Sequence, residues 1–272
     1  MTTPLSPTLV QSEGQIKLRR GTPDVVLCLL LLLPLLIFLF LRSTPAIDLT
    51  LNNHVVHFYV VSYTSLVALV VASFVLSGID PENTRTLFVA MGFTAIAGVF
   101  LIHGVTTPGV IIQGFNQAVG WSARLSFTVG AIFFSLSMLD LSPALRQRIS
   151  RYNRGLWMLL LVVYAGYVWL IFEHPQPFAL LAQSQLVSAV QAIFTVCLFM
   201  WSAWRAWRLY QATGSRWIYV CVFAFGWLAL AQLSQASSPL FQFSWWLYHI
   251  LMFGAVVATM IALVGDYESI LA

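Results

Sequence analysis

The segment NNHVVHFYVVSYTSLVALVVASFVLSG, residues 52–78, decides the fold class of this chain. After two asparagines it becomes a nearly uninterrupted apolar run, and about 20 such residues in a helix are enough to cross a bilayer. The whole chain has the same character, because 60% of its 272 residues are hydrophobic and only 8% are charged. Soluble globular domains carry about 25% charged residues. The sequence therefore predicts an integral membrane protein.

Seven further apolar segments have a similar length. The eight predicted spans cover residues 24–42, 54–78, 86–104, 121–142, 155–173, 184–208, 217–236 and 245–265. We expect an all-α, polytopic transmembrane helical bundle over 24–265, preceded by an N-terminal tail at 1–23 and followed by a C-terminal stub at 266–272. If the first span were a cleaved signal peptide, seven helices would remain.

The positions of Lys and Arg predict the orientation, because these residues gather in cytoplasmic loops. They precede the first span and lie in alternate loops after it: Lys17, Arg19, Arg20, Arg85, Arg146, Arg148, Arg151, Arg154, Arg205, Arg208 and Arg216. The other set of loops contains Arg42 alone, with Arg124 just inside the fourth span. We therefore expect a multi-pass protein of the inner (plasma) membrane with both termini in the cytoplasm. The net charge of +4 fits this topology, so the lipid bilayer and no nucleic acid is the expected partner.

The histidines fall at the outer end of the predicted bundle. His57, His103 and His249 lie roughly 26–32 Å along their helices from the cytoplasmic side. An ionisable residue in an apolar helix usually has a partner, and histidine is the commonest metal ligand. We expect these three, with His54 as a candidate fourth, to bind a transition metal such as copper or zinc, or to ligate a haem. The alternative is that they are amphipathic rings at headgroup level.

Two other features belong to the same outer face. Arg124 lies about one turn into its helix, and we expect it to be a counter-charge for a bound anion, a haem propionate or Glu173, with snorkelling as the alternative. Trp245, Trp246 and Tyr248 are typical of an interfacial aromatic belt.

The sequence contains no pattern typical of catalysis. Walker, GxSxG and HExxH motifs are missing, and the cysteines at 28, 197 and 221 have unrelated spacings. No carboxylate falls in the middle of a span, as ion-coupled carriers often require. We therefore predict neither an enzyme nor an ion-coupled transporter.

Four short motifs resemble a known family. They are HFYVVS (57–62), FLIHGVTTPGV (100–110), GWSARLS (120–126) and WLYHILM (246–252). They are similar to the N-terminal membrane domain of bacterial adenylate/guanylate cyclases and of related diguanylate cyclases and histidine kinases, over roughly residues 50–265. The resemblance implies a sensory input domain that signals to a cytoplasmic effector domain or protein, with a homodimer as one arrangement.

The last residues, GDYESILA, follow the eighth span directly. The resemblance thus leaves open a stand-alone sensor that acts through a partner and a sensor whose output domain is not in this sequence. The alternative function is an electron-transfer or structural subunit of a larger membrane complex.

Overall fold

A computed structural model describes residues 25–77, 84–116 and 118–271. These residues form ten helices and, apart from two isolated bridges, no β-structure. Eight of the described helices are long and apolar enough to cross a membrane. They are α1 (Val25–Ser43), α2 (His54–Ser77), α3 (Thr84–Val105), α4 (Val119–Ser137), α6 (Asn153–Glu173), α8 (Gln185–Thr213), α9 (Arg216–Ser237) and α10 (Phe243–Leu271). The all-α bundle is confirmed, whereas the tail predicted at 1–23 lies outside the described residues.

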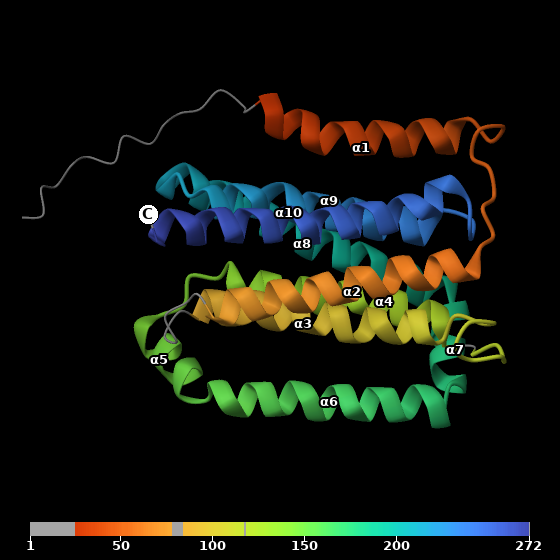
Figure 1. The fold of residues 1–272 in the computed structure, drawn as a ribbon, viewed down its shortest axis with the longest axis horizontal. Helices are drawn as coiled ribbons and strands as arrows, with labels where there is room; N and C mark the ends of the chain where they lie inside the picture. The colour runs from red at the N-terminus through yellow and green to blue at the C-terminus, as the bar shows by residue number, and fades with distance from the viewer. Residues whose placement is uncertain (1–24, 78–83, 117, 272) are drawn as a thin grey trace, which may run out of the picture.

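Two short helices join the spans at opposite ends of the bundle (Figure 1). α5 (Pro143–Arg151) is capped by Ser142, whose hydroxyl accepts from the Leu145 N–H, and has proline in its first turn. These are ordinary helix-start signals. The fourth span was predicted to reach residue 142, but α4 ends at Ser137 and α5 occupies most of the predicted loop. The second short helix, α7 (Gln176–Gln183), lies between α6 and α8.

The helices lie side by side along one direction, with α1 and α6 on opposite flanks (Figure 1). Most of α3 and α9 is buried, whereas α1 and α6 expose most of their apolar side chains. In a membrane these exposed side chains face acyl chains, so burial against protein marks the centre of the bundle. Small residues let α3 and α4 approach closely, because a Cβ on Gly92 would lie 2.7 Å from the Phe134 ring.

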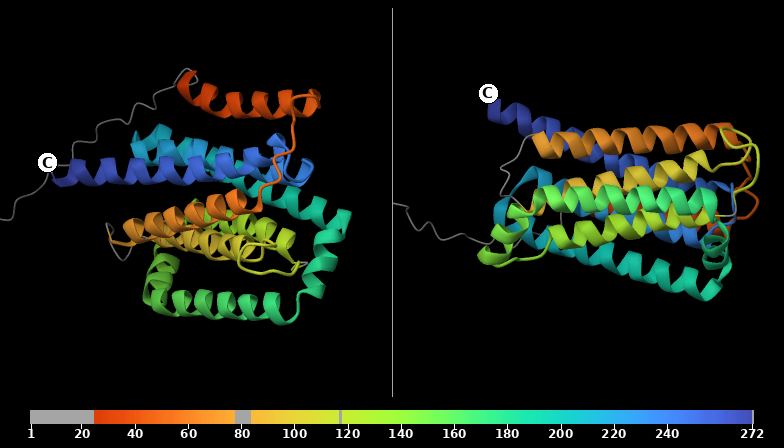
Figure 2. Two further views of the ribbon diagram at one scale, coloured as in Figure 1. Left: turned by 45° about the vertical axis from the view of Figure 1, so that its right-hand side comes forward. Right: turned by 90° about the horizontal axis from the view of Figure 1, so that it is seen from below.

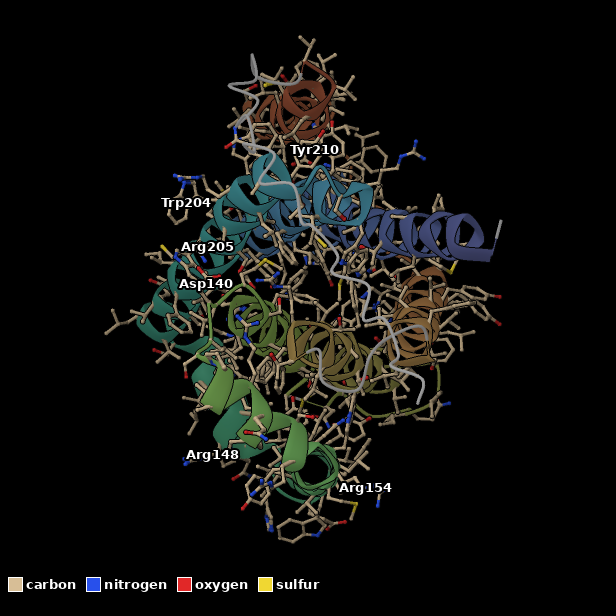
Figure 3. The ribbon with its side chains drawn as sticks, turned by 90° about the vertical axis from the view of Figure 1, so that its left-hand side faces the viewer. Asp140, Arg148, Arg154, Trp204, Arg205 and Tyr210 are labelled. Atoms are coloured by element: carbon tan, nitrogen blue, oxygen red, sulfur yellow. The ribbon has the colours of Figure 1, made fainter. Side chains whose placement is uncertain are left out.

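Most of the arginines gather at the end of the bundle that carries α5. Viewed from this end, Figure 3 shows Arg148 and Arg154 near α5 and Arg205 beside Asp140. Arg205 forms an ion pair with Asp140, and the Arg85 guanidinium lies 3.9 Å from the same carboxylate. The arginine-rich end is the one predicted from the sequence to face the cytoplasm.

At the other end, the segment before α2 holds the start of α10. The buried Asp48 carboxylate accepts from the Ser244 N–H and from its hydroxyl, both at 2.7 Å. It satisfies an amide at the N-terminus of α10, which a helix cannot pair internally. The Trp246 indole donates to the Leu51 carbonyl at 3.0 Å. These contacts set the position of the helix that carries His249.

Candidate metal centre

Three buried histidines from three helices meet near this end of the bundle. His57 lies on α2, His103 on α3 and His249 on α10, with 2%, 5% and 1% of their surfaces exposed. Each offers one ring nitrogen, and the three atoms lie within 4.8 Å of one another. The histidines that were predicted to converge do so.

His57 and His103 face each other through their Nε2 atoms, which are 3.0 Å apart. The Nδ1 of His103 lies 2.8 Å from the Val119 carbonyl. Because a carbonyl only accepts, Nδ1 carries the proton. The Nε2 of a neutral His103 therefore presents a lone pair toward His57. Metal-ligating histidines are commonly oriented by such a bond from the other ring nitrogen.

Thr107 decides where the proton of His57 lies. Its hydroxyl oxygen is 3.1 Å from the His57 Nδ1 and 3.1 Å from the His103 carbonyl. If the hydroxyl donates to His57, then His57 carries its proton on Nε2 and donates to His103. If it donates to the carbonyl, His57 carries its proton on Nδ1 and both Nε2 atoms are free lone pairs. A turn of the Thr107 hydroxyl, together with transfer of the His57 proton from Nε2 to Nδ1, therefore prepares the pair for a cation and leaves both rings neutral.

His249 completes the cluster with two unsatisfied nitrogens. Both its Nδ1 and its Nε2 are buried and have no hydrogen-bond partner within the described part of the chain. Leaving a buried polar group unpaired costs about 1–3 kcal/mol, so native proteins rarely do so without a bound ion, water or function. This imidazole has the donor atoms of a ligand and lies beside two others.

Aromatic rings enclose the three histidines. His249 stacks on Tyr248 with centroids 3.7 Å apart and lies 4.7 Å from Trp245 and 5.1 Å from Trp246. These residues were predicted to be an interfacial belt, but all three are buried. That prediction is wrong because the helix turns this aromatic face inward. The Tyr248 hydroxyl lies 3.4 Å from the His103 Nε2. Tyr248 therefore belongs to the site, although it was not among the site residues predicted from the sequence.

The other predicted site residues lie outside this group of three. The Nδ1 of His54 donates to the Pro108 carbonyl at 3.0 Å, and its ring stacks on Phe241. Arg124 donates to the Ala182 carbonyl and to the Ser188 hydroxyl, which joins α4 to α7 and α8. Among the described residues, neither Glu173 nor the three histidines has an ion pair or hydrogen bond with Arg124 in this arrangement.

The distances suit a bare metal ion. With bonds of about 2.0–2.1 Å, two nitrogens 3.0 Å apart would subtend an angle of about 90° at the ion. Two imidazoles on opposite faces of a haem iron would be about 4 Å apart instead. The spacing of His57 and His103 therefore fits adjacent ligands of one ion and does not fit a pair of axial haem ligands.

No family model, curated protein or solved structure matches this chain.

Proposed function

We propose that this chain is a membrane-embedded sensory module that binds one transition-metal ion, zinc or copper, through His57, His103 and His249. The observation that carries the proposal is the His249 imidazole, with two unpartnered nitrogens buried beside a facing histidine pair. An ion at this point satisfies one of the two unpaired nitrogens of His249 and takes up one lone pair from each of the other two rings.

The sensory part rests on how the ligands are distributed. An ion would tie α2, α3 and α10 together at one end. Of these, α10 runs 29 residues from Phe243 to Leu271. It extends past its neighbours at the arginine-rich end (Figure 2). A shift of α10 on metal binding would therefore be transmitted to the side on which we place the effector. The resemblance to cyclase input domains supports the same direction of signalling.

Metal analysis of the purified full chain tests the binding site. We expect about one zinc or copper ion per chain after chelation, reloading and desalting, and no Soret absorption. His57→Ala, His103→Ala and His249→Ala should each lose the bound ion. His174→Ala is the matched control, because His174 packs on Trp169 at the end of α6, and it should bind normally.

A wild-type protein that binds neither metal after reloading would overturn the proposal. A Soret band would show that the site binds haem instead of a bare ion. Each variant must elute from size exclusion at the wild-type volume, so that loss of metal is not confused with loss of fold.

A further inference from the structure

Three imidazoles alone leave a divalent ion with its full charge in an apolar part of the bundle. All three are neutral ligands, and the described residues place no Cys, Asp or Glu in the group. Charge is costly at such depth and is normally compensated by a nearby group. An acidic fourth ligand, either a side chain or an ionised water, would lower the charge of such a centre.

Tyr248 can supply such a ligand, because its phenol is ionisable and lies beside the histidines. Its oxygen lies 3.4 Å from the His103 Nε2. Ligand atoms around a tetrahedral ion with bonds of about 2.0–2.1 Å are separated by about 3.3 Å. The phenol oxygen and the His103 nitrogen thus already have the spacing of two ligands of one ion.

The Tyr248 ring is also held in place. The residue is fully buried, and its ring lies 6.4 Å from Phe100 and 6.1 Å from Phe127. It stacks on the neighbouring His249, so one turn of α10 delivers two of the donor groups. A ligand locked by packing loses little conformational freedom when an ion binds.

We infer that the Tyr248 oxygen is the fourth ligand of this centre and binds as a phenolate; this rests on the proposed function. When a divalent ion binds, the phenol O–H bond breaks and the oxygen lone pair forms the bond to the metal. The proton leaves to the buffer, so the charge added to the site falls from two to one.

This ligand set selects among ions. Three imidazoles and one phenolate suit zinc or oxidised copper, whereas Cu(I) favours thiolate and thioether ligands and needs less charge compensation. Four protein ligands also close the coordination sphere, as in structural zinc sites, and leave no open position for a reactive water. The centre is thereby fitted to hold an ion rather than to catalyse a reaction.

Copper(II) titration of the chelated full chain tests the inference. The wild type should develop a phenolate-to-copper charge-transfer absorption in the visible region at one ion per chain. Tyr248→Phe should bind copper at least about 10-fold more weakly, a loss that even outer-shell changes produce, and should lack this absorption. Tyr167→Phe is the control, because Tyr167 is a second membrane tyrosine bonded to Ser122, and it should keep the absorption.

The outcomes separate the two proposals. Copper bound by the wild type without the absorption, or an absorption that persists in Tyr248→Phe, would overturn the fourth ligand and leave the histidine site intact. A wild type that binds no metal would overturn both. If Tyr248→Phe does not fold, resonance Raman of the copper-loaded wild type decides, since only a bound phenolate gives enhanced phenolate ring modes.

Discussion

The unpaired nitrogens of His249 distinguish a candidate metal ligand from a histidine that serves only packing. A histidine kept for packing satisfies at least one nitrogen, as His54 does with Pro108. His249 satisfies neither among the described residues. The unpaired imidazole therefore lowers the stability of the protein, and the proposed ion would offset part of that cost by binding one of its nitrogens.

We predict that His249→Phe stabilises the metal-free protein, or leaves its stability unchanged, while removing the stabilisation that zinc gives to the wild type. An aromatic ring of similar size is retained and two unpaired polar atoms are removed, which is worth about 1–3 kcal/mol. The measurement is reversible unfolding in mixed detergent with and without zinc.

His103→Phe is the contrasting variant. It leaves the Val119 carbonyl without its side-chain donor, so it should be destabilised even without metal. Equal destabilisation by the two variants would show that His249 serves packing and would argue against its role as a ligand.

The three candidate ligands could be predicted from sequence because helix rise alone places them at a similar depth. Tyr248 could not, since depth does not tell which side of a helix faces the bundle. For the same reason the sequence could not exclude His54 from the group. It lies one helical turn from His57, but its ring bonds to the Pro108 carbonyl instead. Facing is decided by packing between helices distant in the chain.

The pairing of α4 with α8 shows how polar side chains join spans. Thr128 and Thr195 share a hydrogen bond of 2.8 Å, and Ser135 and Ser202 one of 3.0 Å. Such bonds between membrane helices contribute about 0.6 kcal/mol on average. Beyond them, at the arginine-rich end, Asp140 follows α4 and pairs with Arg205 of α8.

This ion pair makes a prediction about pH. The hydrogen bond from Arg205 is the main cause that lowers the pKa of the Asp140 carboxyl below its usual value. Because the folded pKa is below the unfolded one, the carboxylate stabilises the fold fully above about pH 4 and loses this effect as the pH falls through the folded pKa. Asp140→Asn should therefore lower the free energy of unfolding at pH 7, by at most about 1 kcal/mol for so exposed a pair.

The free energy of unfolding of both proteins is measured from pH 7 to pH 3. The difference between them should shrink below about pH 4 and in high salt. Glu173→Gln, at the opposite end of the bundle, is the control. A wild-type advantage that grows in acid would contradict the expected direction of this pH dependence.

The long helices were predictable because an apolar run of about 20 residues has few alternatives in a membrane. The short ones were not, although Ser142 and Pro143 are a recognisable start signal for α5. α7 begins with no side-chain cap, so its formation depends on the turn between α6 and α8. The predicted stub at 266–272 is likewise helical through Leu271, as a continuation of α10.

The candidate metal centre and most of the arginines lie at opposite ends of the bundle, with Arg42 and Arg124 at the end of the centre. The centre brings together helices that are far apart in the sequence, because α2 and α3 lie near the start of the chain and α10 is the last described helix. An ion bound there restrains one end of α10 relative to α2 and α3. The opposite end of α10 lies beyond the arginine-rich face (Figure 2). The proposed signalling would then depend on whether α10 moves as a rigid helix.

Spin-label distances test that movement. In a background lacking the cysteines at 28, 197 and 221, one label replaces Ile261 on α10 and the other replaces Arg154 at the start of α6; both positions are exposed. Zinc should shift the 154–261 distance by about 1–2 Å or more, the size of known helix shifts in switching proteins. The shift should be absent in His249→Phe, which lacks a ligand on α10. Labels at 154 and at the exposed Trp204 of α8 form the control pair and should show no change. If zinc binds and the 154–261 distance stays constant, the metal serves the stability of the bundle, and the sensory role is wrong.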